Sequence, residues 1–470
     1  MSGRRLAHRV PAMAWLAGGI ALSLGLALRI RGAEGDLWLD EIWSLRLVAL
    51  LREGRFLVES LAVDNNHYLN TLFLLLVGPD APAPVLRSFS ILLGLAAVPV
   101  AGTAMRRIGL SGMIAGMTVF AAAYLFVNYG SEARGYAGLI LMTLLALVLV
   151  ERGLEKPERA TATALGIVAV AGFLFQPIMV LSLGLLGLWA LWASWRASGD
   201  VKRSVQATWR LFMPALAGLL PIVVLIGGAV FRSGTYLIAA KTPFSPANLL
   251  QGYAGLFRAL LGIPDAVPDL LVLAVPLVTL IAVGMVLRST RTSLGIIALI
   301  LFPLMVLVVQ PPNVQFPRYY LASGVVFLLL LAELFAAAWQ RGLAWRVVAG
   351  VLAIAIAFGN ASEIVKLFRY GRGDPLPAMR QIAAADQAVL LNVRDQVVVA
   401  YLGRRHGIGV TTVEPAELCR KRPAFMLTSD EGAPERLTFT QPGCTAAFRR
   451  ESATPFWGLS GSSWTLYRAE

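Results

Sequence analysis

Residues 10–44 read VPAMAWLAGGIALSLGLALRIRGAEGDLWLDEIWS. The first part, from Val10 to Leu28, is an apolar run about long enough to cross a bilayer. We expect it to be a retained membrane anchor rather than a cleaved signal peptide. The second part is a polar stretch that ends in the adjacent carboxylates Asp40 and Glu41. Charge beside a bilayer is costly, so an acidic pair directly after a span predicts a functional site. The alternative is a solvated loop end near a helix start, where acidic residues are favoured.

The rest of the chain is as apolar as its beginning. It has 470 residues, of which 57% are hydrophobic and only 14% are charged. A soluble globular chain has about a quarter of its residues charged, so this composition predicts a polytopic membrane protein. The net charge of +14 is explained by basic residues in short loops rather than by nucleic-acid binding. The three histidines and two cysteines are too scattered to predict a metal cluster.

Hydropathy predicts about eleven membrane spans. They lie near residues 10–29, 86–105, 110–128, 134–150, 161–176, 177–195, 211–231, 268–287, 294–310, 319–338 and 345–360. With a cytoplasmic N-terminus every inside loop is basic, as the positive-inside rule requires. An odd number of spans then places the C-terminus outside. The sequence therefore predicts a multi-pass protein of the plasma (bacterial inner) membrane with a periplasmic or extracellular C-terminal domain.

Two modules are expected along the chain. Residues 1–360 form the transmembrane module, and its first outer loop, residues 30–85, contains apolar runs at 42–51 and 68–77 that are too short to span. Such runs predict interfacial helices. Residues 361–470 alternate short apolar runs with Gly, Pro and charge, which predicts a small exterior α/β domain. Its cysteines, Cys419 and Cys444, are predicted to form a disulfide in an oxidising compartment, the alternative being two unpaired thiols.

The second polar group on the predicted outer side is Asn66, His67 and Asn70, which open one of these short helices. Their spacing puts several hydrogen-bonding groups on one helical face, which suits a sugar or a phosphate. A simple helix cap by Asp64 or Asn65 is the alternative interpretation.

The third group opens the fourth span and contains Glu132, Arg134 and Tyr136. Either the two charges pair with each other, or Arg134 contacts Asp40 or a ligand phosphate.

The fourth group, Arg318 and Tyr319, opens the tenth span. An arginine at a helix N-terminus suits phosphate binding, and interfacial snorkelling is the alternative. Lys241 is a second candidate cation in a large outer loop, and Arg87 is expected to be an interfacial anchor.

Together these motifs resemble the GT-C superfamily of integral-membrane glycosyltransferases. The resemblance is to the subgroup that contains protein mannosyltransferases, aminoarabinose transferases and rhizobial core-galacturonosyl transferases. It rests on five motifs within residues 1–340, in the expected order: Leu39-Asp40-Glu41, Asn66-His67, Leu86-Arg87-Ser88, Glu132-Ala133-Arg134-Gly135-Tyr136 and Arg318-Tyr319.

The resemblance implies transfer of a hexosyl or pentosyl group from a polyprenyl-phosphate sugar to an envelope lipid, glycan or protein, with inversion. Asp40 is then the catalytic base, chosen over the neighbouring Glu41 on the resemblance alone. Glu41 is the second catalytic residue and would position the sugar or the acceptor. Arg318, with Lys241 or Arg134, holds the donor phosphate. The remaining binding residues are Asn66, His67, Asn70, Glu132, Tyr136 and Tyr319. No cofactor is required, and a divalent metal on Asp40, Glu41 and His67 is the alternative arrangement.

Two other classes of protein remain as hypotheses. A transporter or lipid-sugar flippase usually places its ionisable residues near the midplane of the bilayer, on broken helices within paired repeats. The charges of this chain gather at one predicted face, and no internal repeat is evident. A non-catalytic scaffold with an exterior binding domain is the third class.

Overall fold

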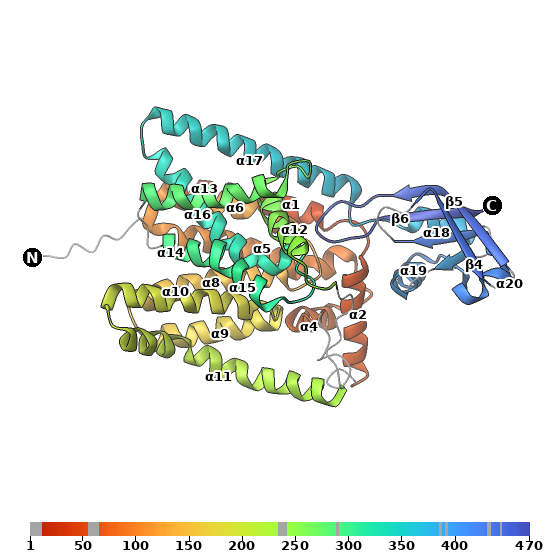
Figure 1. The fold of residues 1–470 in the computed structure, drawn as a ribbon, viewed down its shortest axis with the longest axis horizontal. Coiled ribbons are helices and arrows are strands. Elements are labelled where there is room, and N and C mark those ends of the chain that lie inside the picture. Colours follow the sequence, from red (N-terminus) through yellow and green to blue (C-terminus); the bar gives the residue numbers. More distant parts are fainter. Residues whose placement is uncertain are drawn as a thin grey trace, which may run out of the picture.

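The computed structural model describes residues 12–54, 65–233, 242–287, 291–384, 388–390, 393–429, 434–441 and 444–470. Long helices lie side by side in a bundle, and a small sheet domain lies beyond one end of the bundle (Figure 1). The predicted fold class is confirmed: a helical polytopic membrane protein with short helices in the loop after its first long helix and a small α/β domain at its C-terminus.

The helices of the bundle follow the predicted spans. They are α1 (Ala12–Gly32), α5 (Ala83–Ala104), α6 (Leu110–Ala122), α7 (Tyr124–Tyr129), α8 (Tyr136–Glu155), α9 (Arg159–Phe175), α10 (Met179–Ser198), α11 (Val201–Ser233), α13 (Asp269–Leu287), α14 (Arg291–Ile296), α15 (Phe302–Val309), α16 (Leu321–Trp339) and α17 (Leu343–Tyr370). A π-helical turn, η2 (Ile297–Leu301), joins α14 to α15, and a 3₁₀ turn, η3 (Pro317–Tyr320), leads into α16. Within the described ranges, 7 helical segments are long and apolar enough to cross a membrane. The number of eleven spans stays a prediction.

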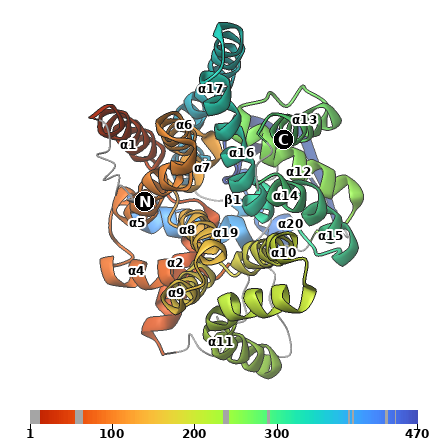
Figure 2. The ribbon, with the colours of Figure 1, turned by 90° about the vertical axis from the view of Figure 1, so that its left-hand side faces the viewer.

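The centre of the bundle is α16. Its residues from Leu321 to Glu333 are all buried, and in the view along the bundle α16 lies inside while α11 and α17 lie at the rim (Figure 2). The rim helices carry exposed large apolar side chains such as Leu220 and Phe358. An apolar outer surface of this kind suits contact with lipid tails, because helices satisfy their own backbone groups there.

Short helices cover the end of the bundle that faces the sheet domain. α2 (Leu39–Arg52) runs across the ends of the long helices, and α4 (Tyr68–Val77) has the predicted bounds (Figure 1). A further helix, α12 (Pro246–Leu261), lies in the outer loop 232–267, where no element was expected. It begins at Ser245, whose side chain accepts the N–H of Asn248 at 3.0 Å and so caps the helix.

The C-terminal domain is built on one mixed sheet with the strand order β2-β1-β3-β6-β5-β4. Its strands are β1 (Ala388–Leu390), β2 (Thr412–Val413), β3 (Phe425–Thr428), β4 (Arg436–Gln441), β5 (Cys444–Thr454) and β6 (Trp464–Ala469). β1 pairs in parallel with β2 and β3, and the other pairs are antiparallel. The helices α18 (Leu376–Ala383), α19 (Val393–His406) and α20 (Leu418–Lys421), with the 3₁₀ turn η4 (Pro415–Glu417), complete the domain.

The join between the two modules differs from the expected one. α17 continues to Tyr370, so the helix passes the boundary placed after residue 360, and the domain begins after Gly371. Cys419 is disulfide-bonded. The side chain of Cys444, the other cysteine of the predicted pair, lies outside the described part of the chain.

Candidate active site

Glu41 lies in the first turn of α2 and forms a buried ion pair with Arg87 of α5. Arg87 Nε and Nη2 donate to the two carboxylate oxygens of Glu41 at 2.8 and 2.6 Å, and both side chains are 0% exposed. The same oxygens accept the backbone N–H groups of Ala133 at 2.7 Å and Trp38 at 3.2 Å. The remaining donors of Arg87 reach the carbonyl oxygens of residues 33–36. The prediction that Arg87 is an interfacial anchor is therefore wrong, because its guanidinium is fully buried.

This pair joins the end of α1, the start of α2, α5 and the turn before α8. Burial acts to raise the pKa of Glu41, but the charge and hydrogen bonds of Arg87 overcome it and hold that pKa below its ordinary value. A carboxylate that is ionised, buried and hydrogen-bonded through both oxygens has no free lone pair to take a proton from a substrate. The geometry therefore favours a positioning role for Glu41 rather than the catalytic role suggested from the sequence.

Asp40 is the carboxylate of the pair that remains accessible. Its side chain is 25% exposed, and its Oδ2 lies 3.1 Å from Arg134 Nη2. Its backbone carbonyl accepts hydrogen bonds from Ser44 Oγ and Asn65 Nδ2, both at 3.1 Å. Two adjacent acidic residues thus have different environments, and of the two Asp40 is the one that can meet a ligand.

Arg134 is the centre of the candidate site. Its Nη2 donates to Asn65 Oδ1 at 2.9 Å as well as contacting Asp40, and its Nε donates to His67 Nε2 at 3.3 Å. Its guanidinium lies 4.7 Å from the ring centroid of Tyr136 and 5.4 Å from that of Trp38. Of the two sequence alternatives for Arg134, contact with Asp40 is closer than contact with Glu132, whose Oε2 lies 4.0 Å away.

His67 is buried and neutral. Burial and then the charge of Arg134 hold its pKa well below the ordinary value. Because Arg134 donates to Nε2, the ring proton is assigned to Nδ1, which lies 3.1 Å from the carbonyl oxygen of Phe175. Both ring nitrogens are therefore engaged. Among the described residues, no group of three or more His, Cys, Asp and Glu side chains could hold a metal ion. The alternative metal set of Asp40, Glu41 and His67 does not fit this geometry.

The two asparagines of the same segment are buried on either side of His67. Asn70 Nδ2 donates to the carbonyl oxygen of Ala133 at 2.7 Å, so α4 holds the turn that carries Glu132 and Arg134. Asn66 is 1% exposed. The neighbouring Asn65, regarded in the sequence only as a helix cap, instead bridges Asp40 and Arg134. Its side chain could not be assigned this role from spacing, because its contacts lie 25 and 69 residues away.

Glu132 is fully buried and meets an arginine from the linker of the sheet domain. Its Oε1 accepts Asn128 Nδ2 at 2.7 Å and lies 3.8 Å from Arg372 Nε. Arg372 also donates to Gly32 O at 2.8 Å and to Ser131 Oγ at 3.1 Å. Burial raises the pKa of Glu132, although the charges of Arg372 and Arg134 act in the opposite direction. Sequence reasoning missed Arg372, because one arginine beyond a span looks like an ordinary interfacial charge.

Arg318 lies in η3, before α16. Its guanidinium packs 4.0 Å from the ring centroid of Phe316 and 5.8 Å from that of Tyr319. It has no ion pair and donates no hydrogen bond within the described ranges. Its charge nevertheless acts on His67 and Arg134, so it faces the same cluster. The second predicted cation, Lys241, lies outside the described residues.

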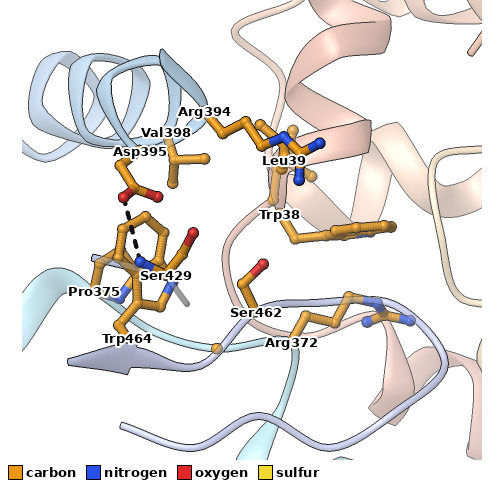
Figure 3. Close-up of a pocket in the computed structure, with 12 residues that line it drawn as sticks. Trp38, Leu39, Arg372, Pro375, Arg394, Asp395, Val398, Ser429, Ser462 and Trp464 are labelled. Atoms are coloured by element: carbon orange, nitrogen blue, oxygen red, sulfur yellow. Dashed lines mark hydrogen bonds between the residues drawn. The ribbon is translucent and has the colours of Figure 1, made fainter. Parts of the chain in front are cut away.

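A cavity separates this cluster from the sheet domain. It is lined by Leu37, Trp38, Leu39, Arg372, Gly373, Pro375, Arg394, Asp395, Val398, Ser429, Ser462 and Trp464 (Figure 3). Asp395 accepts the backbone N–H of Ser429 at 3.3 Å, and Arg394 extends across the cavity towards Leu39 (Figure 3). Trp38 and Arg372 therefore contact both the cavity and the polar cluster.

Comparison with known proteins supports the fold. No protein-family model matches the chain, and no curated protein matches it either. Among solved structures, the chain is similar to the archaeal oligosaccharyltransferase AglB from Archaeoglobus fulgidus, which was solved with an inhibitory peptide and a dolichol-phosphate. The TM-score is 0.53 and the identity 10%, over 89% of this chain and 69% of that one. A second similar structure is the arabinosyltransferase EmbB from Mycobacterium smegmatis, with a TM-score of 0.39 and 14% identity over 78% of this chain and 39% of that one.

At these identities the likeness concerns the fold. At the level of the fold, the likeness to the archaeal oligosaccharyltransferase agrees with the resemblance inferred from the motifs. The chain is a multi-pass membrane protein whose fold is similar to that of this oligosaccharyltransferase.

Proposed function

We propose that the protein is a glycosyltransferase that moves a sugar from a polyprenyl-phosphate donor to an envelope acceptor at the outer face of the inner membrane. The observation that carries this proposal is the presence, in one cluster at one end of the helix bundle, of a partly exposed carboxylate and of a guanidinium that has no ion pair among the described residues. Asp40 is the carboxylate and Arg318 the guanidinium. Buried charges elsewhere in this cluster are paired, as the cost of desolvation requires.

The chemistry needs few groups. The acceptor hydroxyl oxygen attacks the anomeric carbon, and the bond between that carbon and the phosphate oxygen breaks. The polyprenyl phosphate leaves with the bonding electrons, and the hydroxyl proton passes to Asp40. Because the phosphate leaves as a stable anion, no general acid is needed, and attack from the opposite side gives inversion. Arg134, whose Nη2 lies 3.1 Å from Asp40 Oδ2, would hold the carboxylate in this orientation.

Arg318 would hold the leaving phosphate. Arginine presents a planar set of donors that matches phosphate, and charge developing on the leaving group strengthens the contact in the transition state. Packing against Phe316 fixes the guanidinium before the donor arrives, so little side-chain entropy is lost on binding. Lys241 remains the second candidate for this role.

The acceptor would approach through the cavity below the sheet domain. A cavity with aromatic walls and a few polar side chains suits the carbohydrate part of an acceptor. Trp38 and Trp464 supply aromatic surface, and Arg394 and Ser462 supply hydrogen-bonding groups. Arg394→Ala should raise the acceptor KM and leave the donor KM unchanged. Arg404→Ala on the same helix is the matched control, because Arg404 is exposed and lies outside the cavity lining.

The deciding experiment compares purified wild type with Asp40→Asn. Each is incubated with polyprenyl-phosphate sugars and extracted envelope acceptors, and sugar transfer and release of polyprenyl phosphate are measured. Loss of a general base should lower transfer by about 100-fold or more. Asp80→Asn is the control, because Asp80 is an exposed carboxylate in the connection between α4 and α5. Movement of unmodified lipid-linked sugar across vesicles, with no transfer, would instead favour the flippase hypothesis.

A further inference from the structure

The turn that carries Glu132 and Arg134 follows a broken helix. α6 ends at Ala122, Ala123 is extended with φ −62° and ψ 124°, and α7 begins at Tyr124 and has only 6 residues. A break inside a helix bundle leaves carbonyl oxygens of the first helix and N–H groups of the second without helical partners. In a membrane such groups are costly unless other side chains satisfy them.

Arg29 of α1 satisfies the end of α6. Its side chain is 1% exposed, and its Nη1 and Nη2 donate to Ala121 O at 3.0 Å and Phe120 O at 3.1 Å. A third bond goes to Gly25 O in its own helix. Among the described residues no carboxylate pairs with Arg29. A buried cation at a helix C-terminus is favoured by the helix dipole and by its last carbonyl groups, so the α6 terminus takes the place of an acidic partner.

Asn360 of α17 satisfies the start of α7. Its Oδ1 accepts the N–H of Tyr124 at 2.6 Å, and its Nδ2 donates to Leu260 O and Ile356 O. A side-chain oxygen on the first N–H groups of a helix is the usual N-terminal cap, here supplied by another helix. The two ends of the break are therefore held by α1 and α17.

The space around Arg29 is also specific. A Cβ atom at Gly94 of α5 would lie 2.7 Å from Arg29 Nε, and one at Gly130 would lie 2.6 Å from the same atom. Gly130 has φ −76°, a conformation open to any residue, so crowding by Arg29, together with the Phe126 carbonyl oxygen at 2.7 Å, accounts for its glycine. Gly130 is two residues before Glu132, so the Arg29 side chain lies next to the turn that carries Glu132 and Arg134.

We propose that Arg29 and Asn360 are positioning residues, which hold the α6–α7 break and so fix the Glu132–Arg134 turn against Asp40. The catalytic part of this proposal rests on the proposed function, whereas the capping part does not. α7 connects the two regions: Asn128 in α7 donates to Glu132, and Arg134 contacts Asp40. A shift of α7 would therefore move the groups that aim the carboxylate.

Hydrogen exchange of the full-length protein in nanodiscs tests the capping without any substrate. Arg29→Met and Asn360→Ala should raise exchange in peptides covering residues 120–134 and leave α10 peptides unchanged, and Arg29→Lys should have a smaller effect. Gly94→Ala should raise exchange as Arg29→Met does, because the added Cβ atom would lie 2.7 Å from Arg29 Nε and displace the guanidinium. Without this crowding the substitution would stabilise α5, because alanine is a better helix residue than glycine. Gly184→Ala is its control, because a Cβ atom there meets nothing within 4 Å. If Arg29→Met does not fold, Arg29→Lys and Gly94→Ala carry the test.

Transfer kinetics then test the positioning. We expect kcat per folded molecule to fall on the order of 10- to 100-fold with the donor KM unchanged, since misplacement of a catalytic group by about 1 Å costs rates of this size. Unchanged exchange in residues 120–134 would overturn the capping. Raised exchange with wild-type kcat would overturn the positioning role. A wild type without transfer would reject the proposed function, and the exchange result would still decide the capping.

Discussion

Two clusters of buried arginines and carboxylates lie at opposite ends of the bundle, and they are built differently. Arg291, which the predicted topology puts in a basic loop on the inner side, is buried between Glu151 and Glu333 at 2.7 Å from each. It also donates to Ala104 O at 2.5 Å, so it joins α5, α8, α14 and α16. At the other end Arg87 is enclosed in the same way by Glu41, but next to it Asp40 stays partly exposed and Arg318 lacks an ion pair among the described residues.

The difference distinguishes charged groups that stabilise the fold from charged groups that can meet a substrate. A buried ion pair gives little net stability, yet removing one partner leaves an uncompensated charge and is strongly destabilising. The Arg291–Glu151–Glu333 cluster and the Glu41–Arg87 pair both follow this rule. Each acts as a lock, by which we mean a buried ion pair that holds neighbouring helices together. Among the described residues of these two clusters, Asp40 and Arg318 are the charged groups that lack a fully buried ion pair, so we propose that the reacting groups lie there. The predictions below run from the largest effect to the smallest.

Arg87→Met should have the largest effect on stability. It leaves Glu41 buried without its partner, which is expected to lower the free energy of unfolding by about 3–5 kcal/mol. Thermal unfolding in detergent and the yield of monodisperse protein measure this. The double variant Glu41→Leu with Arg87→Met should recover part of the loss, because no buried charge remains. A single variant as stable as wild type would show that the pair is not a lock.

Arg291→Met should also destabilise the fold, because Glu151 and Glu333 lose their shared partner. The side chain of Glu151 is 10% exposed, so water lowers the cost relative to Arg87→Met. Because Arg291 lies at the end of the bundle opposite the candidate site, kcat per folded molecule of Arg291→Met should stay near the wild-type value. A large fall in kcat for the folded fraction would contradict the separation of the two ends.

Arg318→Gln should have the opposite pattern to Arg291→Met, with little change in stability and a large fall in transfer. No ion pair is broken, so the stability should change by less than about 0.5 kcal/mol. Transfer should fall by about 100- to 1,000-fold, the size expected when one donor to a developing charge is removed. Arg318→Lys should keep part of the rate. The control is Arg369→Gln, because Arg369 also packs on an aromatic ring, at 5.4 Å from Tyr370, and is exposed.

His67 should make stability depend on pH. Its pKa in the folded protein lies well below the value of about 6.5 in an unfolded chain, so the unfolded state takes up the proton first. The stability is therefore complete above about pH 6.5 and is lost as the pH falls below it, by at most about 1.4 kcal/mol per pH unit. His67→Gln removes this term. The difference in Tm between wild type and variant should shrink between pH 7.5 and pH 5.5, and a constant difference would contradict the neutral, buried histidine.

The sequence predicted those features that depend on a local pattern of residues. Hydropathy located the helices, the apolar run 68–77 predicted α4 with its observed bounds, and the separate spans 161–176 and 177–195 correspond to α9 and α10. Asp40 and Arg134 were singled out as candidates because charge is rare in so apolar a chain. Arg87 and Arg291 were misinterpreted because their partners lie 46 and 140 residues away. Single arginines near span ends look alike in sequence, and only the fold distinguishes a lock from an anchor.

The smallest effect is expected where the sheet domain meets the first outer loop. His406 Nε2 lies 3.0 Å from Asp36 Oδ1, but the side chains are 32% and 25% exposed. A pair this accessible is worth about 0.2–1 kcal/mol and weakens in high salt. The buried Arg372 makes the stronger connection, because its bonds to Gly32 and Ser131 exclude water. His406→Gln should therefore leave limited proteolysis of the linker at 371–375 nearly unchanged, while Arg372→Met should accelerate it. Equal acceleration by both variants would show that the surface pair, not the buried arginine, holds the domain on the bundle.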